Sequence, residues 1–333
     1  VQPHGGLTRR PGTRFVREVK TSANKTRLVA FQFNVEQAYV LEFGNTYFRI
    51  YKDGGIVVDG SDVPIEVTTP YGTSDLAGLK FAQSADIMYI VHPDYAPRKI
   101  TRTSHTAWTI TSVDLQRGAM GDTNTTSTTL TADDRTGNVT ITASANTFVS
   151  TDVGRLVKLH KGFAKISAYT SATSVDADVQ ALGDGRTELM PEYSSTTISF
   201  HEGDPDATGL EHNDRIEDSD GQFILQNLKK GMKITSSGTT SNNRSGQLIV
   251  DVTDTVITLA PAIDGVDESA GSIFTLKGDL EADSLWQLGA FSDTTGWPRA
   301  VAFYEQRLVF AGTATQPQTI FFSQGGDFEN VER

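Results

Sequence analysis

The sequence predicts an all-β protein: a propeller-like antiparallel β domain with two small β-barrel or β-sandwich modules inserted into it. Three observations lead to this prediction. Short runs of β-branched and aromatic residues alternate with turn-forming residues along almost the whole chain. Three separated stretches share one three-strand pattern, and two segments in the middle of the chain share another. Helix is therefore expected to be a minor component.

The first strands are predicted at residues 27–33, 38–43 and 47–51. The turns that follow the second and third runs contain Gly44-Asn45 and Asp53-Gly54, residue types that are expected to supply the positive φ of tight hairpins. These residues indicate an antiparallel meander. The best helix signal is Ser74, an N-cap candidate before one or two turns that reach Leu79, although Gly78 weakens it.

The three similar stretches are residues 28–51, 79–110 and 301–322. Each has an aromatic-led strand, a polar turn, a second apolar strand, a longer turn and a third strand. This pattern resembles part of a propeller blade, in which each sheet buries its faces against its neighbours. Any other meandering sheet would show a similar pattern, so that alternative stays open.

The middle of the chain has a different composition. Residues 123–131 consist almost entirely of threonine, serine and asparagine, which is too polar for a buried strand. Two segments that resemble each other follow, at residues 152–179 and 230–259, and each has the order of a compact β-barrel or sandwich. We therefore expect a basic arm at 1–27, propeller-like structure at 28–111 and 284–333, and inserted modules at 112–200 and 201–283.

Composition excludes several classes of protein. The formal charge of −12 disfavours a protein that coats nucleic acid, because such a chain repels phosphates on average. The absence of cysteine excludes thiol catalysis, zinc–thiolate sites and disulfides. No apolar run approaches the roughly 20 residues of a membrane span. The charge is divided unevenly, since residues 1–27 hold seven basic residues against Glu18, a balance of +6, and the rest holds −18.

The basic arm suggests a segment that docks on an acidic surface, such as a neighbouring copy of the chain. Arg9, Arg10 and Arg14 are the residues expected to contact the neighbouring subunit. A solvated tail whose charges have no specific partner is the alternative explanation.

Motifs for common chemistry are absent. The chain has no dinucleotide-binding or phosphate-binding glycine loop, no HExxH and no GxSxG. The six histidines are scattered, and none forms an i, i+4 pair. We therefore expect no enzymatic activity, no catalytic residues and no cofactor.

One acidic run, residues 201–220, is the best candidate for a polar site. Its carboxylates could supply oxygen ligands to Ca²⁺, with Asp214, Asp218 and Asp220 as the weak candidates. The EF-hand spacing is absent, so a solvated acidic loop is the favoured explanation and no metal is expected.

Several segments resemble one protein family: residues 5–16, 79–93, 296–299 and 306–313. They are similar to the tail nozzle proteins of T7-like short-tailed bacteriophages, also called tail tubular protein B. The middle of the chain resembles small β modules shaped like the first catalytic-cysteine half-domain of ubiquitin-activating enzyme; without a cysteine, that likeness concerns shape alone. Family members extend beyond both ends of this sequence, so the resemblance implies an incomplete propeller.

The resemblance implies a structural virion protein in the phage tail. Six copies would form a tube that contacts the portal-proximal adaptor and the tail fibres, and genomic DNA would pass through without tight binding. Two alternatives remain: a tail adhesin that binds glycans, with exposed Trp108, Trp286 or Trp297 as stacking platforms, and a glycosidase, which would need a convergent carboxylate pair.

Overall fold

The structure is a computed structural model, and it describes residues 12, 14–34, 37–115, 117–160, 162–181, 187–203, 213–260 and 266–332. It divides into two compact units, residues 1–115 with 295–333, and residues 116–294. Five antiparallel sheets account for the regular structure. The described residues contain no α-helix and one short 3₁₀ turn, η1 (Ser150–Asp152), so the expected all-β class is confirmed.

Unit 1 contains three sheets, each built as a meander of neighbouring strands. The strands of the first sheet are β1 (Arg27–Gln32), β2 (Ala38–Gly44), β3 (Tyr47–Lys52), β4 (Gly55–Ile56) and β5 (Glu66–Thr68). Those of the second are β6 (Lys80–Ser84), β7 (Ile87–His92), β8 (Tyr95–Arg102) and β9 (Trp108–Ser112). Those of the third are β23 (Ala300–Tyr304), β24 (Arg307–Ala311), β25 (Ile320–Gln324) and β26 (Asp327–Glu332).

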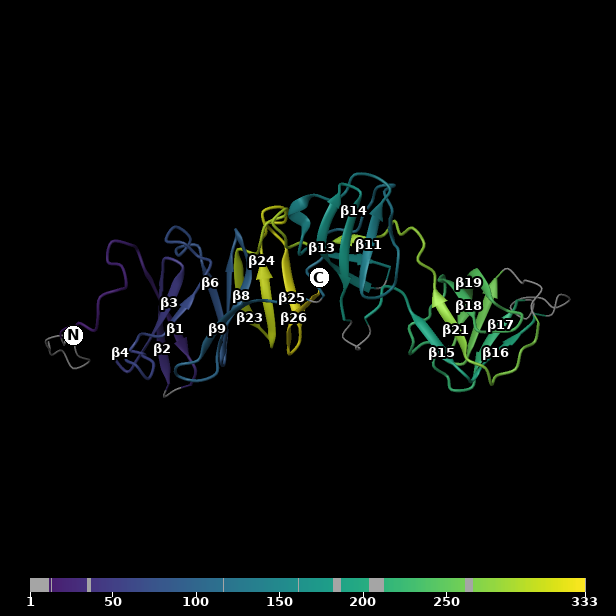
Figure 1. Cartoon of the computed structure of the whole chain (residues 1–333), viewed down its shortest axis with the longest axis horizontal. Coiled ribbons are helices and arrows are strands. Elements are labelled where there is room, and N and C mark those ends of the chain that lie inside the picture. Colours follow the sequence, from purple (N-terminus) through teal and green to yellow (C-terminus); the bar gives the residue numbers. More distant parts are fainter. Residues whose placement is uncertain are drawn as a thin grey trace, which may run out of the picture. The chain divides into compact units, whose positions relative to one another are not determined.

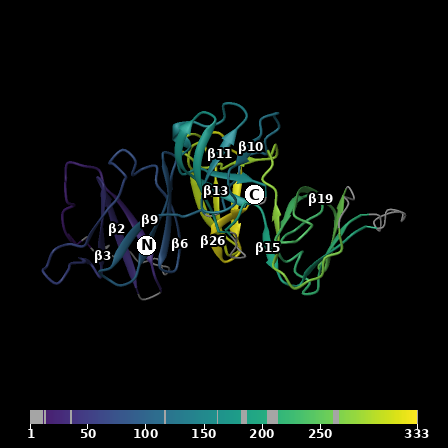
Figure 2. The same cartoon turned by 45° about the vertical axis from the view of Figure 1, so that its right-hand side comes forward.

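The three sheets of unit 1 stack face to face, with the second between the first and the third (Figures 1 and 2). Large apolar side chains fill the space between the first two sheets: Phe31, Tyr39, Leu41, Phe43, Phe48, Ile50, Met88, Ile90, Ile100 and Trp108. On the other face of the second sheet, Tyr89 meets Phe303 and Phe328 edge-on, with ring centroids 5.9 and 6.3 Å away. The sequence of strand β7 is an almost continuous apolar run, because both faces of this strand are covered.

The segment at 73–78 is a correction to the sequence prediction. It forms consecutive turns, with Asp75 N donating to the Gly72 carbonyl at 3.0 Å and Gly78 N to the Asp75 carbonyl at 2.9 Å. The Asp75 carboxylate accepts Gly72 N at 2.8 Å and the Tyr95 hydroxyl at 2.7 Å. These bonds hold Asp75 against the second sheet, and they replace the i→i+4 bonds of a helix.

Unit 2 contains two curled sheets that form half-barrels. The first, module 1, has the order β10-β11-β14-β13-β12-β22, and the second, module 2, has the order β15-β21-β18-β19-β20-β17-β16. Module 1 consists of β10 (Leu130–Ala132), β11 (Asn138–Ala143), β12 (Leu156–Leu159), β13 (Gly162–Ser171), β14 (Ser174–Val179) and β22 (Gln287–Leu288). Module 2 consists of β15 (Glu192–Ser195), β16 (Ile198–His201), β17 (Arg215–Asp218), β18 (Lys233–Ser237), β19 (Arg244–Val252), β20 (Val256–Ala260) and β21 (Phe274–Gly278).

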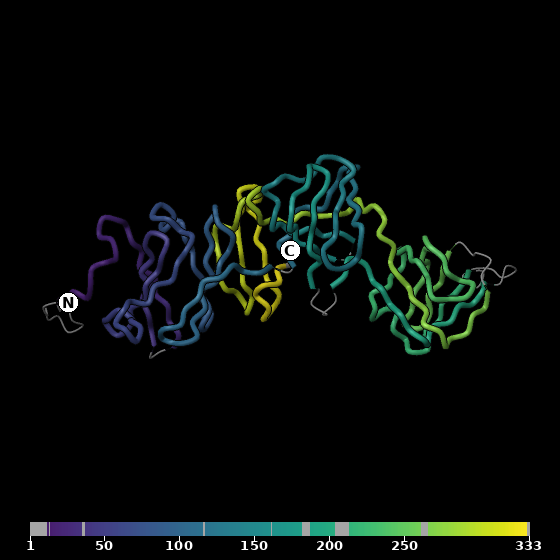
Figure 3. Tube along the Cα trace, viewed as in Figure 1, coloured from purple at the N-terminus to yellow at the C-terminus, as the bar shows by residue number. Residues whose placement is uncertain are grey.

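Each half-barrel curls because its edge strands are linked. In module 1, Leu130 of β10 bridges Asp283, a few residues before β22. In module 2, the edge strands β15 and β16 follow each other directly, and each pairs with a different neighbour. Each module has its own buried apolar cluster. Figure 3 shows that the chain passes through both modules before it returns to unit 1.

Candidate functional site

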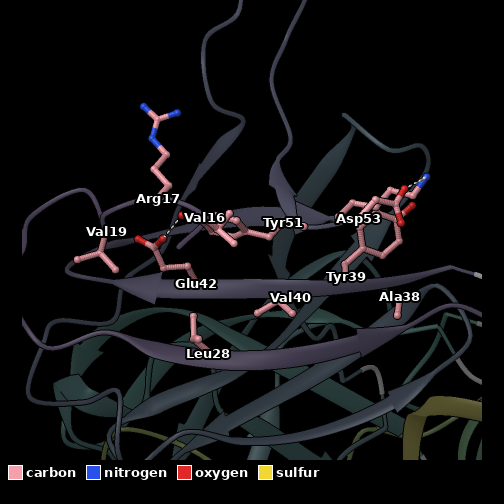
Figure 4. A pocket seen from close by; sticks show the side chains of 12 residues that line it. Val16, Arg17, Val19, Leu28, Ala38, Tyr39, Val40, Glu42, Tyr51 and Asp53 are labelled. Carbon is pink, nitrogen blue, oxygen red and sulfur yellow. Dashed lines mark hydrogen bonds and ion pairs between the residues drawn. The ribbon is translucent and has the colours of Figure 1, made fainter. Parts of the chain in front are cut away.

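A groove lies on the outer face of the first sheet, the face turned away from the second sheet (Figure 4). Its volume is about 360 Å³. Strands β1, β2 and β3 supply its floor, and the N-terminal arm supplies Val16 and Val19. The lining residues are Val16, Arg17, Val19, Leu28, Ala38, Tyr39, Val40, Glu42, Tyr51, Lys52, Asp53 and Gly54.

Strand alternation explains the apolar floor. Leu28 lies opposite Glu42, Ala30 opposite Val40 and Gln32 opposite Ala38, so these side chains share one face of the sheet. Leu28 is 66% exposed and Val40 is 40% exposed. The outer face of the first sheet therefore carries exposed apolar side chains beside polar ones, whereas the inner face is buried in the core.

Glu42 is a buried carboxylate on this face. It is 1% exposed, and it accepts hydrogen bonds from the Tyr47 hydroxyl at 2.8 Å and from the Tyr51 hydroxyl at 2.5 Å. Burial, and then the hydrogen bond to Glu42, raise the pKa of Tyr51 to about 12. The same causes raise the pKa of Tyr47. The two neutral phenols thus stabilise the carboxylate and hold the end of the groove rigid.

The arm is fastened to the first sheet by charged side chains. Lys20 Nζ lies 2.5 Å from Glu66 Oε1, and Arg49 Nε lies 2.9 Å from Glu66 Oε2. The Lys20 ammonium also lies 5.0 Å from the centre of the Tyr47 ring. Burial opposes ionisation of Glu66, but the hydrogen bonds from Lys20 and Arg49 outweigh it and lower the pKa of that carboxyl.

Three arginines are predicted to contact a neighbouring subunit. Arg9 and Arg10 lie outside the described residues, and Arg14 is exposed. Among the described residues of the arm, Lys20 has an acidic partner, Glu66, which belongs to the same chain. Whether the arginines contact another copy stays a prediction.

The three candidate calcium ligands have different surroundings. Asp214 is buried, and its carboxylate accepts Gly203 N at 3.0 Å. Asp220 is exposed. Among the residues that the structure describes, no group of three or more histidine, aspartate or glutamate side chains is placed to hold a metal ion. The part of the acidic run at 204–212 lies outside those residues.

Asp218 has a structural role in module 2. Its carboxylate accepts the hydroxyls of Thr197 at 2.6 Å and Tyr193 at 2.8 Å, and the backbone N–H groups of Asp220 and Gln222 at 3.2 Å each. These four bonds tie the junction between β15 and β16 to the end of β17. Asp218 therefore fastens the curl of the half-barrel.

The tryptophans do not form exposed stacking platforms. Trp108 is 6% exposed and packs between Phe31 and Tyr39, so its expected exposure is wrong. Trp286 is partly buried against the module 1 core, and its indole N–H donates to the Thr128 carbonyl at 2.9 Å. Trp297 is also partly buried. The sequence pattern of a strand does not show which tryptophans are buried, because tryptophan is common both in cores and on binding surfaces.

A second apolar surface lies at the other end of the three-sheet stack. On the third sheet, Tyr304 is 60%, Ile320 54% and Phe322 36% exposed. Cross-strand pairing places Phe322 beside Val309, and Ile320 beside Ala311, on the outer face. The sequence analysis assigned no role to this face or to the groove, although the consecutive apolar residues Ile320, Phe321 and Phe322 indicate that β25 has two apolar faces.

These features define an all-β protein in which a stack of three meander sheets accompanies two curled half-barrels. The sequence matches no protein-family model, and no curated protein matches it significantly. The structure contains no helix, within the residues it describes, that is long and apolar enough to cross a membrane.

Proposed function

We propose that this chain is a structural subunit of the tail of a short-tailed bacteriophage. In this proposal six copies form a nozzle-like tube through which the genome leaves the particle. The observation that carries the proposal is the stack of three meander sheets in unit 1. It is combined with the sequence resemblance described above, which includes β6, β7 and β24.

The stack supports a propeller-like domain. In a propeller, each blade is a four-stranded antiparallel meander, and successive blades pack face to face. The second and third sheets are four-stranded meanders, and the second is covered on both faces. In this proposal, the three sheets are consecutive blades, and the two half-barrels of unit 2, residues 116–294, are β modules inserted between the second and the third.

The charge distribution supports a conduit for DNA. Each phosphate that a protein neutralises adds affinity and retards passage, so a wall with few cations lets DNA slide. The chain carries −12 overall and −18 outside residues 1–27. The tube would contact the portal-proximal adaptor and the tail fibres and would perform no catalytic step.

Electron microscopy of the purified chain, assembled at high concentration, tests this function. Averages viewed along the axis are expected to show six copies around a central channel wide enough for duplex DNA. Antibodies against the inserted modules should label the tail of the virion. Three copies around a solid axis, or labelling of the fibres alone, would contradict the proposal.

A further inference from the structure

A hollow of about 430 Å³ lies on the outer face of module 2, over strands β16 and β17, which Figure 1 labels. Volumes of this size are typical of small-molecule sites. Alternate side chains of the two strands, such as Phe200 and Ile216, are buried in the module 2 core, so the side chains between them point outward. Ser199, His201 and Glu217 thereby reach the hollow and line it.

One wall of the hollow is a segment that runs along the edge of β16, on the side away from β17. Glu268 exchanges backbone hydrogen bonds with Phe200 at 2.8 and 2.9 Å, and Gly271 N donates to the Thr196 carbonyl at 2.8 Å. Ser269 lies between these bonds, so its backbone is held beside β16 at both ends.

The opposite wall is the turn between β19 and β20. Asp218 N donates to the Thr255 carbonyl at 2.9 Å, and this bond ties the turn to the end of β17. Cross-strand pairing places Glu217 between Ser199 and Val256 in one row. Backbone hydrogen bonds therefore hold both walls, and the hollow is formed before any ligand binds.

The polar groups in the hollow supply both hydrogen-bond donors and acceptors. Ser199 Oγ lies 3.1 Å from His201 Nε2, and Glu217 Oε2 lies 3.6 Å from the same nitrogen. Both ionisable side chains are partly exposed, His201 by 38% and Glu217 by 42%. Three more lining residues are exposed, and their hydroxyl groups have no hydrogen-bond partner among the described residues: Ser219, Thr255 and Ser269.

This set of groups matches a saccharide. A sugar ring presents hydroxyl groups that donate and accept around its edge, and C–H groups on its faces. Hydroxyl groups of the protein can answer either role, and the Glu217 carboxylate accepts only. The methyl groups of Val256 and Ala270, which also line the hollow, offer an apolar contact to a ring face.

Other classes of small ligand fit less well. Glu217 and the buried Asp218 would repel an anion such as phosphate. Among the residues that the structure describes, no group of three or more histidine, aspartate or glutamate side chains is placed to hold a metal ion. A neutral ligand that is rich in hydroxyl groups meets neither obstacle.

We propose that this hollow on module 2 binds a neutral saccharide. The Glu217 carboxylate accepts hydrogen bonds from hydroxyl groups of the sugar, and the hydroxyl groups on the two walls bind the rest of its edge. His201 holds Ser199 in position on the floor. The site lies within one module, so the inference goes beyond the proposed tube and does not depend on the number of copies.

Saturation-transfer NMR on the full chain tests this site. The probes are the methyl glycosides of glucose, galactose, mannose and N-acetylglucosamine, added one at a time. At least one of them is expected to bind with a Kd on the order of 1 mM, which is typical of a ligand of this size. Inorganic phosphate, added as a competitor, should not displace it.

Glu217→Ala should weaken binding at least about tenfold, the effect of losing a hydrogen bond to a charged group. Glu192→Ala is the matched control, because Glu192 is a 42% exposed carboxylate on β15 of the same module and lies outside the hollow. It should bind the glycoside like the wild type. Ser269→Ala, at an exposed position of the wall, should weaken binding severalfold without touching the sheet.

Three results would overturn the proposal: a wild type that binds none of the glycosides, a Glu217→Ala variant that binds as the wild type does, and displacement of the sugar by phosphate. Equal melting temperatures show that the variants are folded. If Glu217→Ala does not fold, unchanged affinity in Ser269→Ala refutes the site. None of these results changes the copy number seen by electron microscopy, so the proposed function stands or fails separately.

Discussion

Tyr51 donates its hydroxyl hydrogen to Glu42 at 2.5 Å, on the outer face of the first sheet. Tyr47 donates to the other oxygen of the same carboxylate at 2.8 Å. The buried charge is therefore held by two neutral donors that come from the neighbouring strand, β3. This pair fixes one end of the groove on the first sheet.

Replacing Glu42 with glutamine should make Tyr51 easier to ionise. Burial would still oppose ionisation, but the repulsion from the carboxylate would be gone, so the pKa should fall from about 12 toward 10. The pKa is raised in the folded state, so the stability from this phenol is complete below about pH 10 and is lost as the pH rises toward 12. Ultraviolet titration of tyrosinate measures the change.

Tyr51→Phe identifies the transition in that titration, because it removes one of the nine tyrosines. The part of the curve that titrates near pH 12 should shrink by one tyrosine in this variant. An unchanged titration curve for Glu42→Gln would show that the carboxylate does not control Tyr51.

Replacing Asp218 with asparagine should loosen module 2. Asparagine retains one acceptor oxygen but presents an amide donor toward Tyr193 and the Gln222 N–H. The free energy of opening should fall by about 1–3 kcal/mol, the cost of unsatisfied buried donors. Hydrogen exchange in β15, β16 and β17 measures this loss, with module 1 as the internal reference.

The pH dependence of that loss has a definite sign. Burial opposes ionisation of Asp218, but hydrogen bonds from Thr197 and Tyr193 outweigh it, so its pKa is lowered. Its stabilisation is therefore present above about pH 4, the ordinary range, and is lost as the pH falls through the lowered pKa. Exposed Asp220→Asn is the control and should change stability by less than about 0.5 kcal/mol. Equal effects from both substitutions would refute the assigned role.

Replacing Gly78 with alanine should destabilise unit 1. A Cβ atom there would lie 2.5 Å from His92 Nε2 and 2.8 Å from His92 Cδ2, and His92 is buried. Overpacking of this kind costs about 1–3 kcal/mol. Gly60→Ala, where no atom lies within 4 Å of the new carbon, is the matched control. Calorimetry should show a lower melting temperature for Gly78→Ala alone; equal melting temperatures would contradict this packing.

Reversing the charge of Arg9, Arg10 and Arg14 to glutamate should weaken assembly at moderate salt, if the arm docks on an acidic neighbour. The same change should have a smaller effect at high salt, because exposed charges are screened there. Sedimentation at two salt concentrations measures both effects. Intact assembly of the triple variant at moderate salt would remove the arm from the interface.

The strands were largely predictable from the sequence. The runs at 27–33, 38–43 and 47–51 correspond to β1, β2 and β3 within one or two residues, because alternation and glycine turns specify hairpins locally. The repeats at 152–179 and 230–259 likewise form three-strand meanders. The helix expected at residues 74–79 does not form. The Asp75 carboxylate accepts hydrogen bonds from Gly72 N and the Tyr95 hydroxyl, and these bonds outweigh a weak local helix signal.

The site was less predictable, because it depends on which strands become neighbours. Glu42 looks like an ordinary polar position, and its burial becomes clear only when β3 places Tyr47 and Tyr51 beside it. The sequence also could not separate Asp218, whose oxygens bind protein donors, from exposed Asp220 two residues later. In both cases the partners come from other strands.

The central claim is that six copies of this chain close into a tube. Cryo-electron microscopy of the assembled wild type tests it most directly. The account predicts six copies around an open channel that is wide enough for duplex DNA. A closed dimer, or a ring with another number of copies, would contradict it.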